Sequence, residues 1–294
     1  MPTERHARLF LENAIWGDVR FCPHCGSLSF RPLRGTSVRP GLYQCAETEC
    51  RRQFTVTTRT PLHATKLDLR TWVAAMFLVL TSSKGISSVV MSRILGVNQK
   101  TAWKLGHAIR EMMDDRQGIA GRLSGVVEVD ETFVGGKPKF RHGVKNMRGR
   151  GTGKPIALVA AARNGQARAT LIPNAQGCTM KPIIEDWIDP ASVLITDKNS
   201  SYHKIGASFA NHLTVQHNKR QYANRKTAAH INTVEAVNAV VQRALIGVYH
   251  RLGRKHLQRY LAEIIWRWNH RAPETRVRQR KSSTGSQSVE TRTV

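Results

Sequence analysis

Three acidic residues spread along the second half of the chain constrain its fold more than any other feature. Asp130 closes the segment GVVEVD and Asp197 closes SVLITD, and both segments have the short apolar pattern of buried strands. Glu235 follows in HINTVEAVNAVVQR, which predicts a helix. Two strand ends and a helix can hold two divalent metal ions over a phosphodiester. The order of these segments therefore favours polynucleotidyl transfer.

The charge of the chain points to the same kind of partner. Its 294 residues include 46 Lys and Arg against 20 Asp and Glu, a net charge of +26. Such an excess favours a polyanion, most simply nucleic acid, without choosing DNA over RNA. No apolar run approaches the roughly 20 residues of a membrane span, and the first residues lack the apolar core of a secretory signal. We expect a cytoplasmic protein with no membrane contact.

Four cysteines near the start predict a metal site. They form two pairs about 20 residues apart, the usual arrangement of a tetrahedral zinc site. The second pair has four intervening residues where two are usual, a spacing that zinc tolerates. We expect structural Zn²⁺ in a ribbon that either contacts DNA or braces its neighbour, held by Cys22, Cys25, Cys45 and Cys50. The basic segment RRQFTVTTRT that follows predicts a strand.

The next segment predicts a helix-turn-helix. LDLRTWVAAMFLVLTSS has the pattern of one helix, and two more flank a tight turn at Gly96, with Asn98 as the cap of the second. The inward stripe is expected at Ile86, Val90, Ile94 and Leu95. The last helix would present polar side chains suited to the major groove, namely Gln99, Lys100, Thr101 and Lys104. The alternative is an ordinary helical hairpin.

The rest of the chain has the element order of a ribonuclease-H-like α/β domain. Three strands, the last two joined by a hairpin at Asn164-Gly165, precede a helix at 179–189. The strands SVLITD and LTVQH and two long helices complete a mixed five-stranded sheet with helices. The lone Cys178 is expected to be buried. The expected units are a zinc ribbon with an N-terminal helix (1–66), a helix-turn-helix region (67–118), a catalytic domain (119–271) and a basic disordered tail (272–294).

Each acid also has a simpler interpretation. An Asp after a strand is commonly a turn or cap residue, and an acid near a helix start stabilises the helix dipole. The three acids in this order make metal binding the better hypothesis. Asn232 and Glu235 are three residues apart and share a helix face, and Arg243, two turns on, could meet a phosphate. Glu128 and Glu131 are neighbours that are less well placed.

Taken together, the segments CPHC, EVDETFVGG, TDKNSSY, HINTVE and HLQRYLAEIIWRWNHR resemble the zinc-ribbon DDE transposases of bacterial insertion sequences, the ISXO-like group. The likeness covers roughly residues 15–271. It implies a ribonuclease-H-like catalytic domain whose Mg²⁺ or Mn²⁺ is held by Asp130, Asp197 and a third residue, either Glu235, which we favour, or Asn232. Gln242 stands where a Lys is usual in the family, and the neighbouring Arg243 is the candidate substitute.

The resemblance also sets the expected partners. These are DNA, both the terminal inverted repeats of the element and the target, and further copies of the chain, as a homodimer or larger synaptic assembly. The protein would then be bacterial and associated with the nucleoid. Two alternatives stay open at this point: an inactive or domesticated DNA-binding regulator, and a structure-specific nuclease of the same fold.

Overall fold

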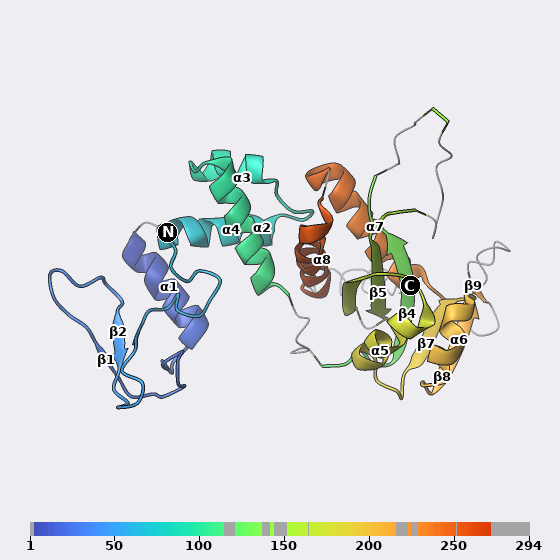
Figure 1. The fold of residues 1–294 in the computed structure, drawn as a ribbon, viewed down its shortest axis with the longest axis horizontal. Coiled ribbons are helices and arrows are strands. Elements are labelled where there is room, and N and C mark those ends of the chain that lie inside the picture. Colours follow the sequence, from blue (N-terminus) through green and yellow to red (C-terminus); the bar gives the residue numbers. More distant parts are fainter. Residues whose placement is uncertain are drawn as a thin grey trace, which may run out of the picture.

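The computed structural model describes residues 3–114, 121–136, 142–143, 152–163, 165–215, 223–224, 229–250 and 252–271. The tail, Asn164 of the expected hairpin turn and most of the basic loop 137–154 lie outside these residues. Figure 1 shows the ribbon and the first helices at one end of an elongated molecule and the large sheet at the other. Helices α4 (Gln99–Met112) and α8 (Arg254–Asn269) meet between the two ends.

The N-terminal unit pairs one helix with a small sheet. Helix α1 (Glu4–Trp16) precedes the antiparallel strands β1 (Phe30–Pro32), β2 (Tyr43–Cys45) and β3 (Gln53–Phe54). The strand predicted over RRQFTVTTRT is much shorter than expected. Its threonines turn the chain, because the Thr58 hydroxyl accepts a hydrogen bond from the backbone N–H of Thr55 at 2.9 Å. Such local bonds compete with a strand ladder.

Three helices lie where the sequence predicts them. Helix α2 (Leu69–Thr81) is followed by α3 (Ser88–Leu95) and α4. Gly96 turns the chain with a left-handed φ of 66°, which glycine adopts without steric cost. Asn98 caps α4 by accepting from the backbone N–H of Thr101 at 2.7 Å.

The predicted inward stripe of α3 was partly wrong. Val90 and Ile94 are 46% and 58% exposed, whereas Met91 is 1% exposed. The buried stripe runs through Met91 and the partly buried Leu95, four residues on, so it is rotated by one position from the expected one. Since α3 has only eight residues, its apolar sequence pattern does not fix which side packs.

One core joins the ribbon to these helices. Trp16 and Phe54 of the N-terminal unit belong to the same buried cluster as Trp72 of α2 and Leu105 of α4. The rings of Trp16, Tyr43 and Phe54 also contact one another. The ribbon therefore braces the helices, whatever else it contacts.

The second half of the chain forms the five-stranded sheet predicted from its sequence. The strands are β4 (Val126–Phe133), β5 (Ile156–Ala162), β6 (Ala167–Ile172), β7 (Val193–Asp197) and β8 (Asn211–Val215). Their order is β6-β5-β4-β7-β8; β5 is antiparallel to both β4 and β6, and β7 is parallel to both β4 and β8. Three antiparallel strands followed by two parallel ones give the ribonuclease-H-like fold.

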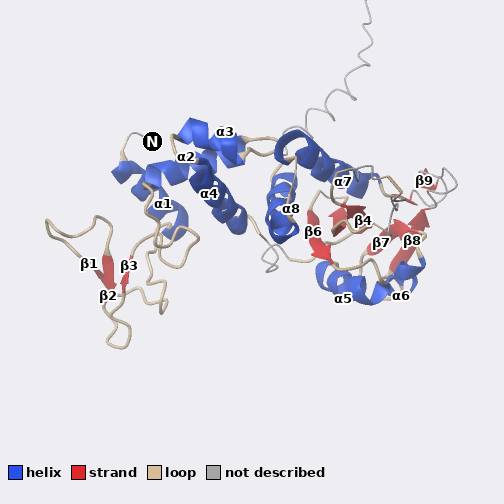
Figure 2. Cartoon of the chain, turned by 45° about the horizontal axis from the view of Figure 1, so that its top comes forward, coloured by secondary structure: helices blue, strands red, loops and turns tan. Residues whose placement is uncertain are grey.

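Helices cover both faces of this sheet (Figure 2). Helix α5 (Gly177–Trp187), the short η2 (Ser200–Tyr202) and α6 (His203–Gly206) pack on one face. Helix α7 (Asn232–Ala244), its π-helical extension η4 (Leu245–Tyr249) and α8 pack on the other. Two short strands, β9 (Ala223–Asn224) and β10 (Ala229–His230), pair before α7. Cys178 is exposed, not buried as expected. Among the described residues no helix is long and apolar enough to span a bilayer.

A buried ion pair links the two ends of the molecule. Arg110 of α4 donates to Glu263 of α8 at 2.5 Å, and neither side chain is more than 4% exposed. Glu263 also accepts from Arg267 at 2.5 Å and from the Tyr249 hydroxyl at 2.9 Å. Beside this network the ring of His107 packs against the rings of Trp103, His256 and Tyr260.

His107 should make stability depend on pH. Burial first, and then the charges of Arg110, His256 and Arg259, lower its pKa to about 4. Between pH 6.5 and 4 the unfolded chain binds a proton that the folded one does not, so the free energy of unfolding should fall as pH falls through this range. The loss should reach about 3 kcal/mol.

Urea unfolding of the wild type and His107→Phe at pH 7 and pH 4.5 measures this contribution. Phe keeps the ring contacts and cannot titrate, so the variant should lose less stability over the same range. Parallel losses in the two proteins would show that other groups carry the pH dependence.

Candidate functional site

The strand register brings Asp130 and Asp197 to one edge of the sheet. Strands β4 and β7 are parallel, with Val126 opposite Val193 and Glu128 opposite Ile195. The partners in each pair are 67 positions apart in the sequence, and Asp130 and Asp197 have the same separation, so continuing this register by two residues places them side by side. Side chains alternate along a strand, so both acids lie on the face of Glu128 and Ile195, which α7 covers.

Asp130 is surrounded by negative charge. Burial first, then the charge of Glu131, and then those of Asp197 and Glu235, raise the pKa of Asp130 to about 7. A cation would relieve this repulsion, and carboxylate oxygens are the ligands that Mg²⁺ and Mn²⁺ prefer. The residues thus fit a divalent metal. In the described part of the chain, however, only the ribbon cysteines bring three or more ligand atoms within 4.8 Å of one another, so the acids form an open set.

Helix α7 is attached to β4 by three polar contacts at regular spacing. The backbone N–H groups of Thr233 and Val234 donate to Glu128 at 2.7 and 3.0 Å. Asn238 donates to Asp130 Oδ2 at 2.9 Å, and Gln242 donates to Thr132 Oγ1 at 3.3 Å. The contacts recur every four residues of the helix, about 6 Å, and every two of the strand, about 6.6 Å. The two periods match closely enough for one register to satisfy all three contacts.

The predicted third residues lie on this same helix. Glu235 is exposed in the first turn of α7, and its charge acts on Asp130. Asn232 is also exposed, at the first position of the helix. Arg243 is exposed in the last turn of α7. The residue of this turn that contacts β4 is its neighbour Gln242. Both candidates for the third position therefore lie exposed in the first turn of α7, and the charge of Glu235 acts on Asp130.

Sequence reasoning missed Asn238. It lies three residues after Glu235, a spacing that puts both on one helix face, and this signal could have identified it. Glu128 and Glu131 have separate partners. Glu128 is fully buried under the start of α7, whereas Glu131 accepts from the buried Tyr202 hydroxyl at 2.8 Å.

The four ribbon cysteines have the geometry of a zinc site. The Sγ atoms of Cys22 and Cys50 are 3.9 Å apart and those of Cys25 and Cys45 are 3.6 Å apart. Disulfides require about 2.05 Å, whereas thiolates around a tetrahedral Zn²⁺ at about 2.3 Å lie close to the observed separations. Arg51, directly after the widened second pair, takes a positive φ of 48°. The residues fit structural zinc.

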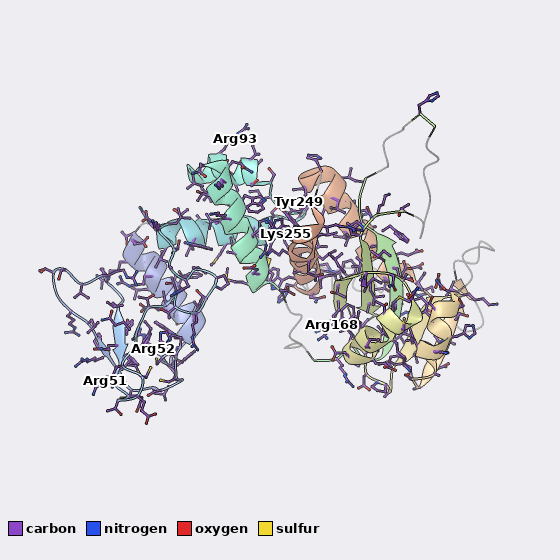
Figure 3. The ribbon with its side chains drawn as sticks, viewed as in Figure 1. Arg51, Arg52, Arg93, Arg168, Tyr249 and Lys255 are labelled. Atoms are coloured by element: carbon purple, nitrogen blue, oxygen red, sulfur yellow. The ribbon has the colours of Figure 1, made fainter. Side chains whose placement is uncertain are left out.

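The polar side chains predicted to read DNA lie at the start of α4. Gln99, Lys100 and Lys104 are exposed, and Thr101 is half-buried. Gln99 donates to the Ser88 hydroxyl at 2.7 Å. Further cations are exposed on α3, at Arg93, and on the ribbon, at Arg51 and Arg52 (Figure 3).

Two family models match the chain. Residues 122–269, half of its length, match the ISXO2-like transposase domain, and residues 2–53 match the transposase zinc-ribbon domain. The first match contains Asp130, Asp197 and α7, and the second contains all four ribbon cysteines.

Individual proteins show weaker likenesses. A Haemophilus influenzae protein named "Uncharacterized transposase-like protein" is 28% identical over 99 residues, which cover 34% of this chain and 77% of that protein. Two solved structures are similar at 12% identity. The Mos1 mariner paired-end complex with Mn has a TM-score of 0.30 over 72% of this chain and 78% of that one. A pre-cleavage Mos1 transpososome has a TM-score of 0.29 over 74% and 79%.

Replacing one buried ligand should empty the zinc site. Cys45→Ser is expected to reduce bound zinc from about one per chain to near zero, measured by elemental analysis of purified protein. Structural zinc binding contributes on the order of 10 kcal/mol to folding, and the ribbon shares its core with α2 and α4. The thermal midpoint should therefore fall as well.

The matched control is Cys178→Ser, which changes an exposed cysteine outside the ribbon. It should keep both the zinc content and the thermal midpoint of the wild type. Zinc retained by Cys45→Ser would contradict the four-cysteine assignment.

Proposed function

We propose that this chain, which belongs to the family of ISXO2-like transposases, cuts the phosphodiester at the ends of an insertion sequence and joins the freed 3′ ends to target DNA. The single observation that carries this proposal is the site at the edge of the sheet. There the register of β4 and β7 aligns Asp130 with Asp197, and α7 adds Glu235 and Asn238.

The roles follow from the positions of the side chains. Asp130, Asp197 and Glu235 hold divalent metal, and Asn238 orients the Asp130 carboxylate through its 2.9 Å hydrogen bond. The bound ions supply activation of the attacking oxygen and stabilisation of the leaving oxygen. The raised pKa of Asp130 reflects the site without a cation, and a metal would favour the ionised carboxylate. Arg243, exposed at the end of α7, contacts a DNA phosphate.

The N-terminal half supplies the DNA-reading surface. Helix α4 enters the major groove of a terminal inverted repeat, with Gln99 and Thr101 toward the bases and Lys100 and Lys104 toward the flanking phosphates. The net charge of +26 supports binding to both element and target DNA. Two ends must be paired before joining, so we propose a dimer or larger assembly on DNA.

Asp130→Asn should abolish cleavage and keep end binding. The amide has the size of the carboxylate but not its charge, so metal binding should fail while α4 is untouched. The assay uses labelled DNA carrying the element's ends, with Mg²⁺ or Mn²⁺, and follows strand cleavage and joining. We expect a loss of at least a hundredfold for Asp130→Asn and Asp197→Asn.

The control is Asp186→Asn, an exposed acid of α5 on the other face of the sheet. It should retain the wild-type rate. Comparing Glu235→Gln with Asn232→Ala separates the two candidates for the third position, and we expect the large loss only for Glu235→Gln. End-specific binding with no products from the wild type would instead support a DNA-binding regulator.

Neutralising two lysines of α4 should weaken end binding without changing the chemistry at the site. For Lys100→Ala/Lys104→Ala, the slope of log affinity against log salt should fall by about two, because each phosphate contact contributes about 0.9. Fluorescence anisotropy over a salt series measures this slope. The control is Lys181→Ala on α5, which removes a lysine paired with Glu185 and should leave the salt slope unchanged. An equal decrease of the slope in the double variant and in the control would show that the lysines of α4 bind DNA only non-specifically.

A further inference from the structure

Glu128 is a fully buried carboxylate two residues before Asp130. On one oxygen, Oε2, it accepts from the backbone N–H groups of Thr233 and Val234. On the other, Oε1, it accepts from the Thr233 hydroxyl at 3.1 Å and from the guanidinium of Arg163 at 2.9 Å. Both oxygens are therefore used by protein donors, and Arg163 balances the charge.

This arrangement explains why α7 begins where it does. The helix has no side-chain cap of its own at Ile231. The N–H of Asn232 donates to His230 Nδ1 at 3.4 Å, and the next N–H groups need partners from outside the helix. Glu128, supplied from β4, accepts from the N–H groups of Thr233 and Val234 and interacts favourably with the helix dipole. Arg163 also donates to the backbone carbonyl of His230 at 3.2 Å, so one guanidinium contacts both Glu128 and strand β10.

The anchor lies beside the residues that would hold metal. Along β4, Glu128 is two residues from Asp130 on the same face, and along α7 its partner Val234 directly precedes Glu235. A buried carboxylate with four donors cannot move far without leaving several of them unsatisfied, at a cost of about 1–3 kcal/mol each. The position of Glu235 relative to Asp130 is therefore fixed close to the site.

We propose that Glu128 is a positioning residue for the catalytic metal: it sets the distance between Asp130 on β4 and Glu235 on α7 without itself binding the ion. This inference rests on the proposed function. The sequence pattern identified Glu128 only as a neighbour of the site, and the proposal assigns it a role there.

The variant that tests this role is Glu128→Gln, which keeps the volume and one acceptor but turns a donor group toward the N–H groups of α7. Thr233→Val, which removes only the hydroxyl contact, is a milder second variant. The control is Glu185→Gln on α5, a hydrogen-bonded acid on the opposite face of the sheet, which accepts from the Ser208 hydroxyl at 2.5 Å. Mn²⁺ binding to each full-length protein without DNA is measured by electron paramagnetic resonance, below the temperature at which any variant unfolds.

We expect Glu128→Gln to weaken Mn²⁺ binding about tenfold and Thr233→Val to weaken it less, with end binding unchanged. Cleavage by Glu128→Gln should recover in part at high Mn²⁺, whereas Asp130→Asn should not recover. A lower thermal midpoint with wild-type Mn²⁺ affinity would overturn the positioning role and leave Glu128 as a structural cap. Failure of the proposed function gives a different result, in which Asp130→Asn leaves Mn²⁺ binding unchanged.

Discussion

The attachment of α7 to β4 is the contact on which the candidate site depends. Strand β4 is central in the sheet and carries Asp130, while α7 carries Glu235 and Asn238. Three polar contacts, at Glu128, Asp130 and Thr132, fix the register between strand and helix. Slipping the helix by one residue would turn Asn238 and Gln242 away from the strand and leave a buried carboxylate without its donors. The polar contacts thus select one arrangement from those that apolar packing alone would allow.

A second constraint joins this site to the N-terminal half. The pair Arg110 and Glu263 is buried between α4 and α8, and Tyr249 and Arg267 complete the bonds of Glu263. Breaking such a pair by removing one partner costs about 3–5 kcal/mol, because a buried charge is left uncompensated. Helix α4 also carries the lysines proposed to bind DNA, so the buried pair lies between that helix and one that packs on the sheet. The ribbon is joined to the same helices, since its aromatic residues share one core with α2 and α4.

Local patterns predicted most of the elements. The alternation around Asp130, the apolar run before Asp197 and the cap and glycine at Asn98 and Gly96 are signals that act over a few residues, and each element formed as expected. The errors arose where packing decides. Thr55 and Thr58 turned a predicted strand into turns, and α3 buried Met91 instead of Val90 and Ile94. Cys178, expected to be buried, lies exposed at the start of α5.

The sequence by itself determined the order of the strands and helices, the cysteine spacing for zinc and the presence of acids at two strand ends, because periodicity, turn residues and ligand spacing are local properties. Only the tertiary structure decided which polar residues meet. Asn238 contacts Asp130 across 108 positions of sequence and Glu128 caps a helix that begins more than 100 residues later. The spacing from Glu235 can assign Asn238 to the helix face of the site, but its pairing with Asp130 depends on the register between α7 and β4. That register is set by buried charges and hydrogen bonds that neither segment shows alone.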